Sequence, residues 1–130
     1  MKRIFQVFLI VFGMVAMGIA IAHLILGPAS IPGSIPVNAT MDSEDRFYAV
    51  LFGAFGVALM WCTKDIETKS TFVYFLAVTF FIGGLARLIS VAAVGWPHPL
   101  FIFLTLLELI IPVYMIWAQY QIRRNFIASN

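Results

Sequence analysis

The stretch "TFVYFLAVTFFIGGLARLISVAAVG", Thr71–Gly95, contains a single charged residue, Arg87. An α-helix needs about 20 consecutive apolar residues to cross a hydrocarbon core about 30 Å thick. The stretch therefore predicts a transmembrane helix with an arginine inside it. An unpaired arginine at such a depth costs about 3 to well over 10 kcal/mol, so Arg87 should have a partner or a wet cavity.

The composition of the whole chain also indicates a membrane environment. Hydrophobic residues make up 62% of the 130 residues and charged residues 11%, a balance that excludes an ordinary soluble domain. Lipid leaves no water to bond an exposed backbone, so each apolar segment should be helical. We predict an all-α fold, an integral membrane four-helix bundle formed by one domain over residues 1–130. The expected helices span about 4–26, 43–63, 71–94 and 99–121, with an outer loop over about 27–42.

The basic residues predict the orientation. They flank one side of the expected bundle: Lys2, Arg3, Lys64, Lys69, Arg123 and Arg124. Because Lys and Arg are enriched in cytoplasmic segments, both termini should be cytoplasmic, an N-in/C-in topology. The first apolar run is longer than that of a usual signal peptide, so we expect no cleavage.

Several classes of function lack support in the sequence. A net charge of +2 does not indicate a nucleic-acid partner, because the basic residues at the helix ends are explained by topology. The single cysteine, Cys62, allows no internal disulfide and forms no metal cluster. No nucleophile–base motif and no phosphate loop is present, so we expect no cofactor and no metal, and assign no catalytic residue.

Arg87 and Glu108 are natural partners. Counting from Pro97 in the expected turn, Arg87 lies ten residues back and Glu108 eleven forward, which places both at nearly the same depth. The helical stripe of Glu108 is the most polar face of its helix and also holds Phe101, Thr105, Pro112, Met115 and Gln119. The stripe of Arg87 is rich in small residues and holds Phe80, Gly83, Gly84, Ser90 and Val94. Small residues let membrane helices approach closely, so both stripes should face inward, with Ser90 and Thr105 as further buried polar candidates.

Two more polar side chains lie on small-residue faces. Arg46 is in line with Ala49, Gly53, Gly56 and Met60, whereas Tyr48, Leu51, Phe55 and Leu59 occupy the opposite, lipid-facing side. His23 continues the line of Ala16, Ala20 and Gly27. We therefore expect His23, Arg46, Arg87 and Glu108 to converge on the outer half of the bundle.

Each of these residues also has a structural interpretation. Arg87 and Glu108 could form an ion pair that only fixes helix register. His23 could be a hydrogen-bonded packing residue. Arg46 could extend to the interface or pair with Asp42 one turn earlier, and the acidic residues around Asp42 could only cap their helix.

Three functional hypotheses follow. Two arginines against one buried glutamate leave surplus positive charge unless Asp42 or Asp45 folds inward, and that surplus suits the carboxylate or phosphate headgroup of an anionic amphiphile or lipid. The alternative is a structural or accessory subunit of a larger membrane complex or a homo-oligomer. The third hypothesis is an intramembrane enzyme in which Glu108 or His23 moves a proton, although the chain is more simply a binding protein than an enzyme.

Four motifs carry a resemblance to a known family: "EDRFYAVLFGAFG", "FFIGGLARLIS", "GWPHP" and "LELIIP". With these motifs the chain resembles the small bacterial membrane proteins of domain of unknown function 4345 over nearly its whole length. The family's characteristic charges fall on Arg46, Arg87 and Glu108. The resemblance implies a multi-pass, four-helix protein of the bacterial inner membrane, and it implies no particular activity, substrate or cofactor.

Overall fold

The computed structural model describes residues 1–129, and these residues form an all-α fold. Its α-helices are α1 (Lys2–Leu26), α2 (Ala39–Cys62), α3 (Ser70–Val94) and α4 (Pro99–Ala128), and a short 3₁₀-helix, η1 (Gly27–Ser30), follows α1. Each of the four α-helices is long and apolar enough to cross a membrane. The all-α class and the four membrane-span helices predicted from the sequence are therefore confirmed.

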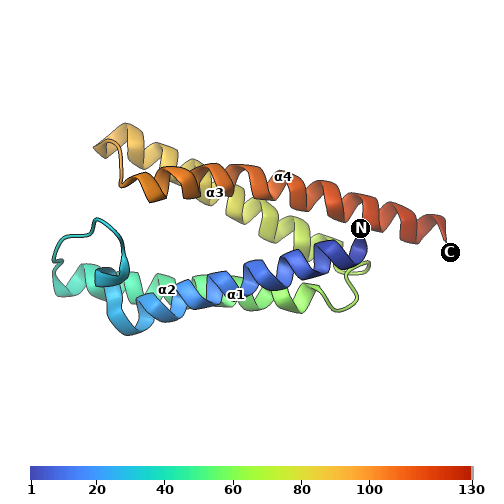
Figure 1. Ribbon diagram of the computed structural model, residues 1–130, viewed down its shortest axis with the longest axis horizontal. Helices are drawn as coiled ribbons and strands as arrows, with labels where there is room; N and C mark the ends of the chain where they lie inside the picture. Colours follow the sequence, from blue (N-terminus) through green and yellow to red (C-terminus); the bar gives the residue numbers. More distant parts are fainter. Residues whose placement is uncertain (130) are drawn as a thin grey trace. The chain divides into compact units, whose positions relative to one another are not determined.

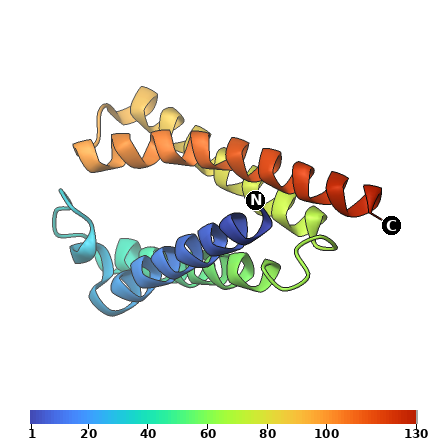
Figure 2. The ribbon, with the colours of Figure 1, turned by 45° about the vertical axis from the view of Figure 1, so that its right-hand side comes forward.

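The chain forms two compact units, which we describe separately. One unit, Gln6–Lys64, contains most of α1, then η1 and α2. The other comprises Met1–Phe5 and Asp65–Asn130 and contains α3 and α4. Within each unit the two long helices run antiparallel and side by side (Figures 1 and 2).

Local signals explain where the helices begin. Helix α2 begins at Ala39, four residues earlier than expected, because the side chain of Asn38 accepts a hydrogen bond from the backbone N–H of Met41 at 3.0 Å. Helix α4 begins at Pro99 after a turn in which Gly95 has a φ of 107°, a conformation that favours glycine. Helix α4 also continues to Ala128, beyond the expected end near 121, so both Arg123 and Arg124 belong to it.

Glycines bring α1 and α2 together. A Cβ built on Gly56 would lie 2.7 Å from the carbonyl oxygen of Gly13 and 3.2 Å from the Cβ of Ala16. Only residues without a side chain allow two helix backbones to approach so closely. The predicted inward face of α2 is confirmed at Ala49, Gly53 and Gly56, which are all buried.

The predicted lipid-facing side of α2 is only partly right. Tyr48 and Leu51 are exposed, but Phe55 is half-buried and Leu59 is completely buried. The ring of Phe55 meets that of Phe12 on α1 edge to face, with ring centroids 5.8 Å apart. From Gly53 onward the buried positions advance in steps of three, Gly53, Gly56, Leu59 and Cys62. Three residues fall about 60° short of one turn, so the buried face rotates around α2 and reaches Leu59.

In the other unit, Gly84 is the point of close contact between α3 and α4. A Cβ on Gly84 would lie 3.0 Å from the Cβ of Glu108 and 3.0 Å from a methyl carbon of Leu109. The expectation that Gly83 shares this contact is wrong, because a Cβ built there has nothing within 4 Å. The predicted inward stripe of α4 is buried from Thr105 to Gln119.

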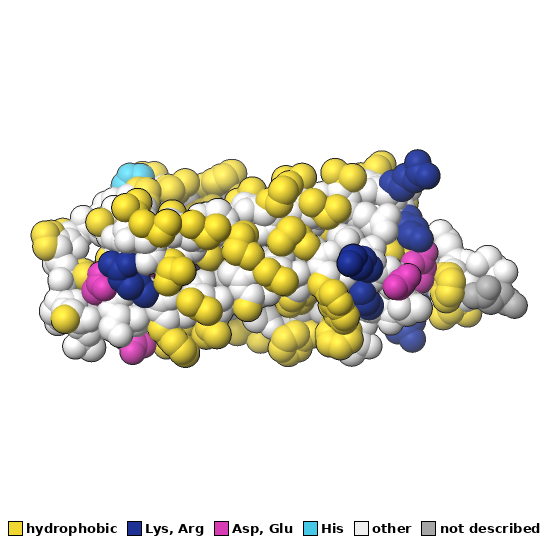
Figure 3. All heavy atoms as spheres, turned by 90° about the horizontal axis from the view of Figure 1, so that it is seen from below, with side chains coloured by type: hydrophobic (Ala, Val, Ile, Leu, Met, Phe, Trp, Pro, Cys, Tyr) yellow, Lys and Arg dark blue, Asp and Glu magenta, His cyan; other side chains and the backbone are white. Residues whose placement is uncertain are grey.

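The molecular surface matches a lipid environment. On the face drawn in Figure 3, hydrophobic side chains cover the middle, and charged side chains gather toward the ends. Large apolar residues remain exposed on every long helix, for example Val15, Leu51, Ile89 and Val113. Such surfaces would be costly in water and are ordinary in hydrocarbon.

Candidate functional site

The ion pair expected inside the α3–α4 unit forms. Nε of Arg87 donates a hydrogen bond to Oε2 of Glu108 at 2.7 Å. The side chain of Glu108 is only 11% exposed, whereas that of Arg87 is 41% exposed. The carboxylate is thus the hidden partner, and the guanidinium lies at the edge of the α3–α4 contact.

Small and aromatic neighbours place the Arg87 side chain. Gly84, one turn before Arg87, lets the backbone of α4 approach at the position of Glu108. The guanidinium carbon of Arg87 lies over the ring of Phe101, 5.5 Å from its centroid, a cation–π arrangement. These contacts hold the guanidinium plane while only one of its three nitrogens bonds Glu108. Among the described residues, no hydrogen bond engages Nη1 or Nη2 of Arg87.

Among the described residues, the other two polar side chains predicted near this pair form no hydrogen bond with Arg87 or Glu108. Thr105 is buried, and its hydroxyl donates to the carbonyl oxygen of Phe101 at 2.7 Å, a bond within α4. Ser90 is exposed on α3. The structure therefore brings together Arg87, Glu108 and Phe101, and leaves Ser90 outside the group.

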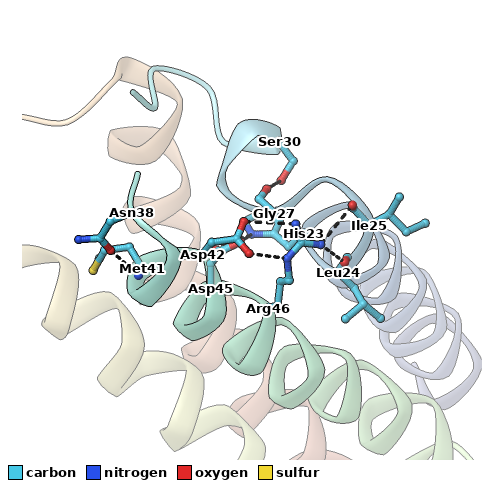
Figure 4. Close-up of polar contacts among 10 residues, drawn as sticks. All are labelled: His23, Leu24, Ile25, Gly27, Ser30, Asn38, Met41, Asp42, Asp45 and Arg46. Carbon is cyan, nitrogen blue, oxygen red and sulfur yellow. Dashed lines mark hydrogen bonds and ion pairs between the residues drawn. The ribbon is translucent and has the colours of Figure 1, made fainter. Parts of the chain in front are cut away.

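In the α1–α2 unit, Arg46 closes the end of α1. Its Nε and Nη2 donate to the two carboxylate oxygens of Asp42 at 2.8 and 3.2 Å, and its Nη1 donates to the carbonyl oxygens of Leu24 and Ile25 at 2.6 and 3.2 Å (Figure 4). The last carbonyls of a helix lack partners within the helix and form the negative end of its dipole. A bound guanidinium therefore satisfies these carbonyl oxygens and offsets the partial negative charge. Among the interpretations considered for Arg46, the pairing with Asp42 is present in the structure.

The Arg46–Asp42 pair at the end of α1 requires a glycine at position 27, where the chain leaves the helix. Gly27 has a φ of 63°, and a Cβ there would lie 2.7 Å from Oδ1 of Asp42 and 2.8 Å from Nη2 of Arg46. A side chain at this position would thus strain the backbone and displace the ion pair. The hydroxyl of Ser30 donates to the carbonyl oxygen of Gly27 at 2.8 Å, which fixes the same turn (Figure 4).

His23 has a partner that the sequence did not assign. Its Nδ1 lies 3.0 and 3.2 Å from the two carboxylate oxygens of Asp45. An ionised carboxylate can only accept, so Nδ1 carries the hydrogen in this contact. Asp45 follows the helix signal of Asn38 by two turns of α2, and only the packing of α1 against α2 brings it to His23.

These pairings change the charge balance expected from the sequence. Asp42 neutralises Arg46, and Glu108 neutralises Arg87, so the predicted surplus of positive charge does not arise from these two arginines. The donor capacity of the two guanidinium groups nevertheless differs. Arg46 uses all three of its nitrogens, and Arg87 uses one. No group of three or more His, Cys, Asp or Glu side chains that could hold a metal ion occurs among residues 1–129.

Toward the other end of α4 lies a buried amide whose hydrogen bonds were not predicted from the sequence. Gln119 is completely buried, and its Nε2 donates at 2.8 Å to both the carbonyl oxygen of Ile66 and the hydroxyl of Ser70. These bonds tie α4 to the first residue of α3 and to the segment before it. Nearby, Glu67 pairs with Lys2, and the hydrogen bond from Lys2 lowers the pKa of the Glu67 carboxyl. The position of Gln119 on the Glu108 stripe was the only sequence signal for this role.

Comparison with known proteins gives a family and no assigned activity. No curated protein matches the chain. No solved structure matches it either. The sequence pattern of one family matches residues 4–119, which include Arg46, Arg87 and Glu108 and parts of all four long helices. The chain therefore belongs to the family described as Domain of unknown function (DUF4345).

Proposed function

We propose that this protein is a small multi-pass protein of the bacterial inner membrane, with both termini cytoplasmic, that binds an anionic amphiphile or lipid through Arg87. The observation that supports the proposal is that only one of the three guanidinium nitrogens of Arg87 forms a hydrogen bond with Glu108. Glu108 accepts from Nε alone, and the Nη1 and Nη2 edge has no hydrogen-bond partner among the described residues. By the positive-inside rule, this edge lies in the outer half of the membrane.

The chemistry of that edge selects an anion with two oxygens. A guanidinium presents parallel N–H groups that match a carboxylate or a phosphate in a bidentate arrangement. Because Glu108 already balances the charge of Arg87, the attraction comes from these charge-assisted hydrogen bonds, which strengthen where water is scarce. The exposed side chains of Leu85, Leu88 and Ile89 on α3 provide apolar surface for the chain of such an amphiphile.

The other polar residues receive different roles in this proposal. Glu108 and Phe101 position the guanidinium of Arg87. Arg46 and His23 hold α1 against α2, because Arg46 of α2 donates to the carbonyl oxygens of Leu24 and Ile25 on α1 and His23 of α1 bonds Asp45 of α2. Arg87 is thus the residue expected to touch the ligand, and Arg46 is expected to contribute stability.

Native mass spectrometry with added ligand tests the proposal. The wild-type protein should bind dioleoyl phosphatidylglycerol or oleate more tightly than dioleoyl phosphatidylcholine, and comparison of the two anions tells a phosphate from a carboxylate. In an Arg123→Gln/Arg124→Gln background, which removes the exposed basic pair near the end of α4, Arg87→Gln should weaken binding of the preferred anion about 10-fold to 150-fold, the loss of a hydrogen bond to a charged group. The matched control Lys64→Gln removes one positive charge from an exposed position and should bind like wild type. Equal binding by Arg87→Gln and Lys64→Gln would overturn the proposal.

A second candidate, an accessory subunit or homo-oligomer, is favoured by one observation on α3. Small residues form an exposed stripe along this helix: Thr79, Gly83, Ala86, Ser90 and Ala93. A Cβ on Gly83 has nothing within 4 Å, so another helix could approach there as α1 approaches α2 at Gly56. Cysteine at position 83 should then crosslink to a partner in native membranes, and the same substitution at the lipid-exposed Ile89 should not. Equal crosslinking at both positions would contradict this candidate.

A further inference from the structure

An apolar groove lies on the α3–α4 unit, away from the Arg87–Glu108 pair. It is lined by Tyr74 from α3 and by Ile116, Trp117 and Tyr120 from α4, and its volume is about 460 Å³. Ile116, Trp117 and Tyr120 are each at least 40% exposed. The lining is almost entirely side-chain carbon and aromatic ring, which suits a hydrocarbon chain.

Two arginines continue the same face of α4. Arg123 follows Ile116 by seven residues and Tyr120 by three, and Arg124 follows Trp117 by seven and Tyr120 by four. Residues with these spacings lie above one another on an α-helix, about 10 Å apart for a spacing of seven. Both arginines are exposed, and no acidic residue follows Glu108 anywhere in the chain. Among the described residues, no ion pair engages either arginine.

The position of Arg123 and Arg124 along α4 places them at the depth of lipid headgroups. The helix is 30 residues long, about 45 Å, and exceeds a hydrocarbon core of about 30 Å. Tyr120 and Trp117 thus lie where aromatic side chains meet the interface, and the arginines lie beyond them at headgroup level. The α4 residues that line the groove precede the arginines and therefore lie on their membrane side.

We propose that this groove holds one acyl chain of an anionic phospholipid whose phosphate is bound by Arg123 and Arg124. The complementary charge of the arginines selects the headgroup, and the aromatic groove selects the chain. This site is separate from the one at Arg87 and does not depend on it. A belt of interfacial aromatic residues without a bound lipid would show no preference for a charged headgroup.

Fluorescence quenching at Trp117 tests the site directly. The chain has three tryptophans, so Trp61→Phe/Trp96→Phe leaves Trp117 as the only one. In phosphatidylcholine nanodiscs, brominated phosphatidylglycerol should quench Trp117 at a much lower mole fraction than brominated phosphatidylcholine. At about fivefold for each basic residue at the membrane surface, the two arginines predict a preference of about 25-fold.

Matched variants identify the residues responsible. In the same single-tryptophan protein, Arg123→Gln/Arg124→Gln should abolish the preference for phosphatidylglycerol. Arg3→Gln/Lys64→Gln removes the same charge from exposed positions outside α4 and should keep the preference, as should Arg87→Gln. Equal quenching by the two brominated lipids before any arginine is changed would overturn the proposal. Weak quenching by both lipids, as expected if a second copy covers the groove, would overturn it as well.

Discussion

The close approach of α1 and α2 predicts a graded response to alanine at three glycines. In Gly56→Ala, the new Cβ would lie 2.7 Å from the carbonyl oxygen of Gly13, which is 0.7 Å short of the 3.4 Å of an ordinary contact. In Gly53→Ala, the Cβ would lie 3.3 Å from that of Ala20, a deficit of only 0.1 Å. In Gly83→Ala, the Cβ would meet nothing within 4 Å.

The expected free energies of unfolding follow from two opposing effects. Alanine is favoured over glycine in a helix interior by about 1 kcal/mol, and this gain applies to all three variants. Overpacking costs about 1–3 kcal/mol and applies fully only where backbone must move, as at Gly56. Gly83→Ala should therefore be neutral or stabilising by up to about 1 kcal/mol, Gly53→Ala should be close to neutral, and Gly56→Ala should be destabilising by about 0–2 kcal/mol, which makes it the least stable of the three.

Thermal unfolding in a mild detergent, with the three variants measured in parallel, checks this order. Gly83→Ala is the matched control, because it makes the same chemical change within a helix of similar length. If Gly56→Ala is as stable as Gly83→Ala, the two helix backbones do not meet at Gly13 and Gly56, and the packing argument for the α1–α2 unit fails.

Three further predictions concern polar contacts. Arg87→Leu and Glu108→Leu should each cost about 3–5 kcal/mol of stability, and Glu108→Leu should cost more because the guanidinium that it leaves unpaired cannot give up its charge. The double variant should recover most of the loss, and simple additivity of the two single changes in this double-mutant cycle would contradict a shared site. Asn38→Ala should cost about 1 kcal/mol by removing the N-cap of α2, and an unchanged unfolding temperature would show that α2 does not depend on it. Lys2 lowers the pKa of Glu67, so their pair stabilises the fold above the ordinary pKa near 4.5 and loses this contribution as the pH falls below it. The stability difference between wild type and Glu67→Gln should be less than about 1 kcal/mol, because the pair is partly exposed, and it should shrink below that pH. A stability difference that grows as the pH falls would contradict this prediction.

The Arg87–Glu108 pair could be predicted from sequence because it depends on regular geometry. Helix rise is constant, and the turn between α3 and α4 is short, so counting from Pro97 sufficed to place both residues at one depth. Periodicity could not tell which of the adjacent glycines meets α4, because Gly83 and Gly84 differ by about 100° and both lie near the Arg87 stripe. Likewise, an ideal helical projection placed Leu59 with Tyr48, and only the rotation of the buried face along α2 reveals that it is covered.

The role of Arg46 could not be settled from spacing. Its distance from Asp42 allowed an ion pair, but a guanidinium in an apolar setting suited an external anion equally well. The decision depends on two features of the α1–α2 unit, the early start of α2 at Ala39 and the positive φ of Gly27. Together they bring the last carbonyls of α1 to Arg46, and these acceptors occupy the donors that a ligand would need.

If the Arg87–Glu108 pair serves binding, a folded variant without the pair should no longer hold the ligand. Arg87→Leu/Glu108→Leu removes both charges of the pair, so the protein should recover most of the stability that either single variant loses and unfold near the wild-type temperature. Native mass spectrometry of this variant, with Arg123→Gln/Arg124→Gln added to it and to its parent so that the lipid site proposed at those arginines is removed from both, should then show the anion bound by the parent, phosphatidylglycerol or oleate, retained no better than phosphatidylcholine. Undiminished retention of that anion by the double variant would contradict the claim and leave Arg87 and Glu108 as a pair that only sets the register of α3 and α4.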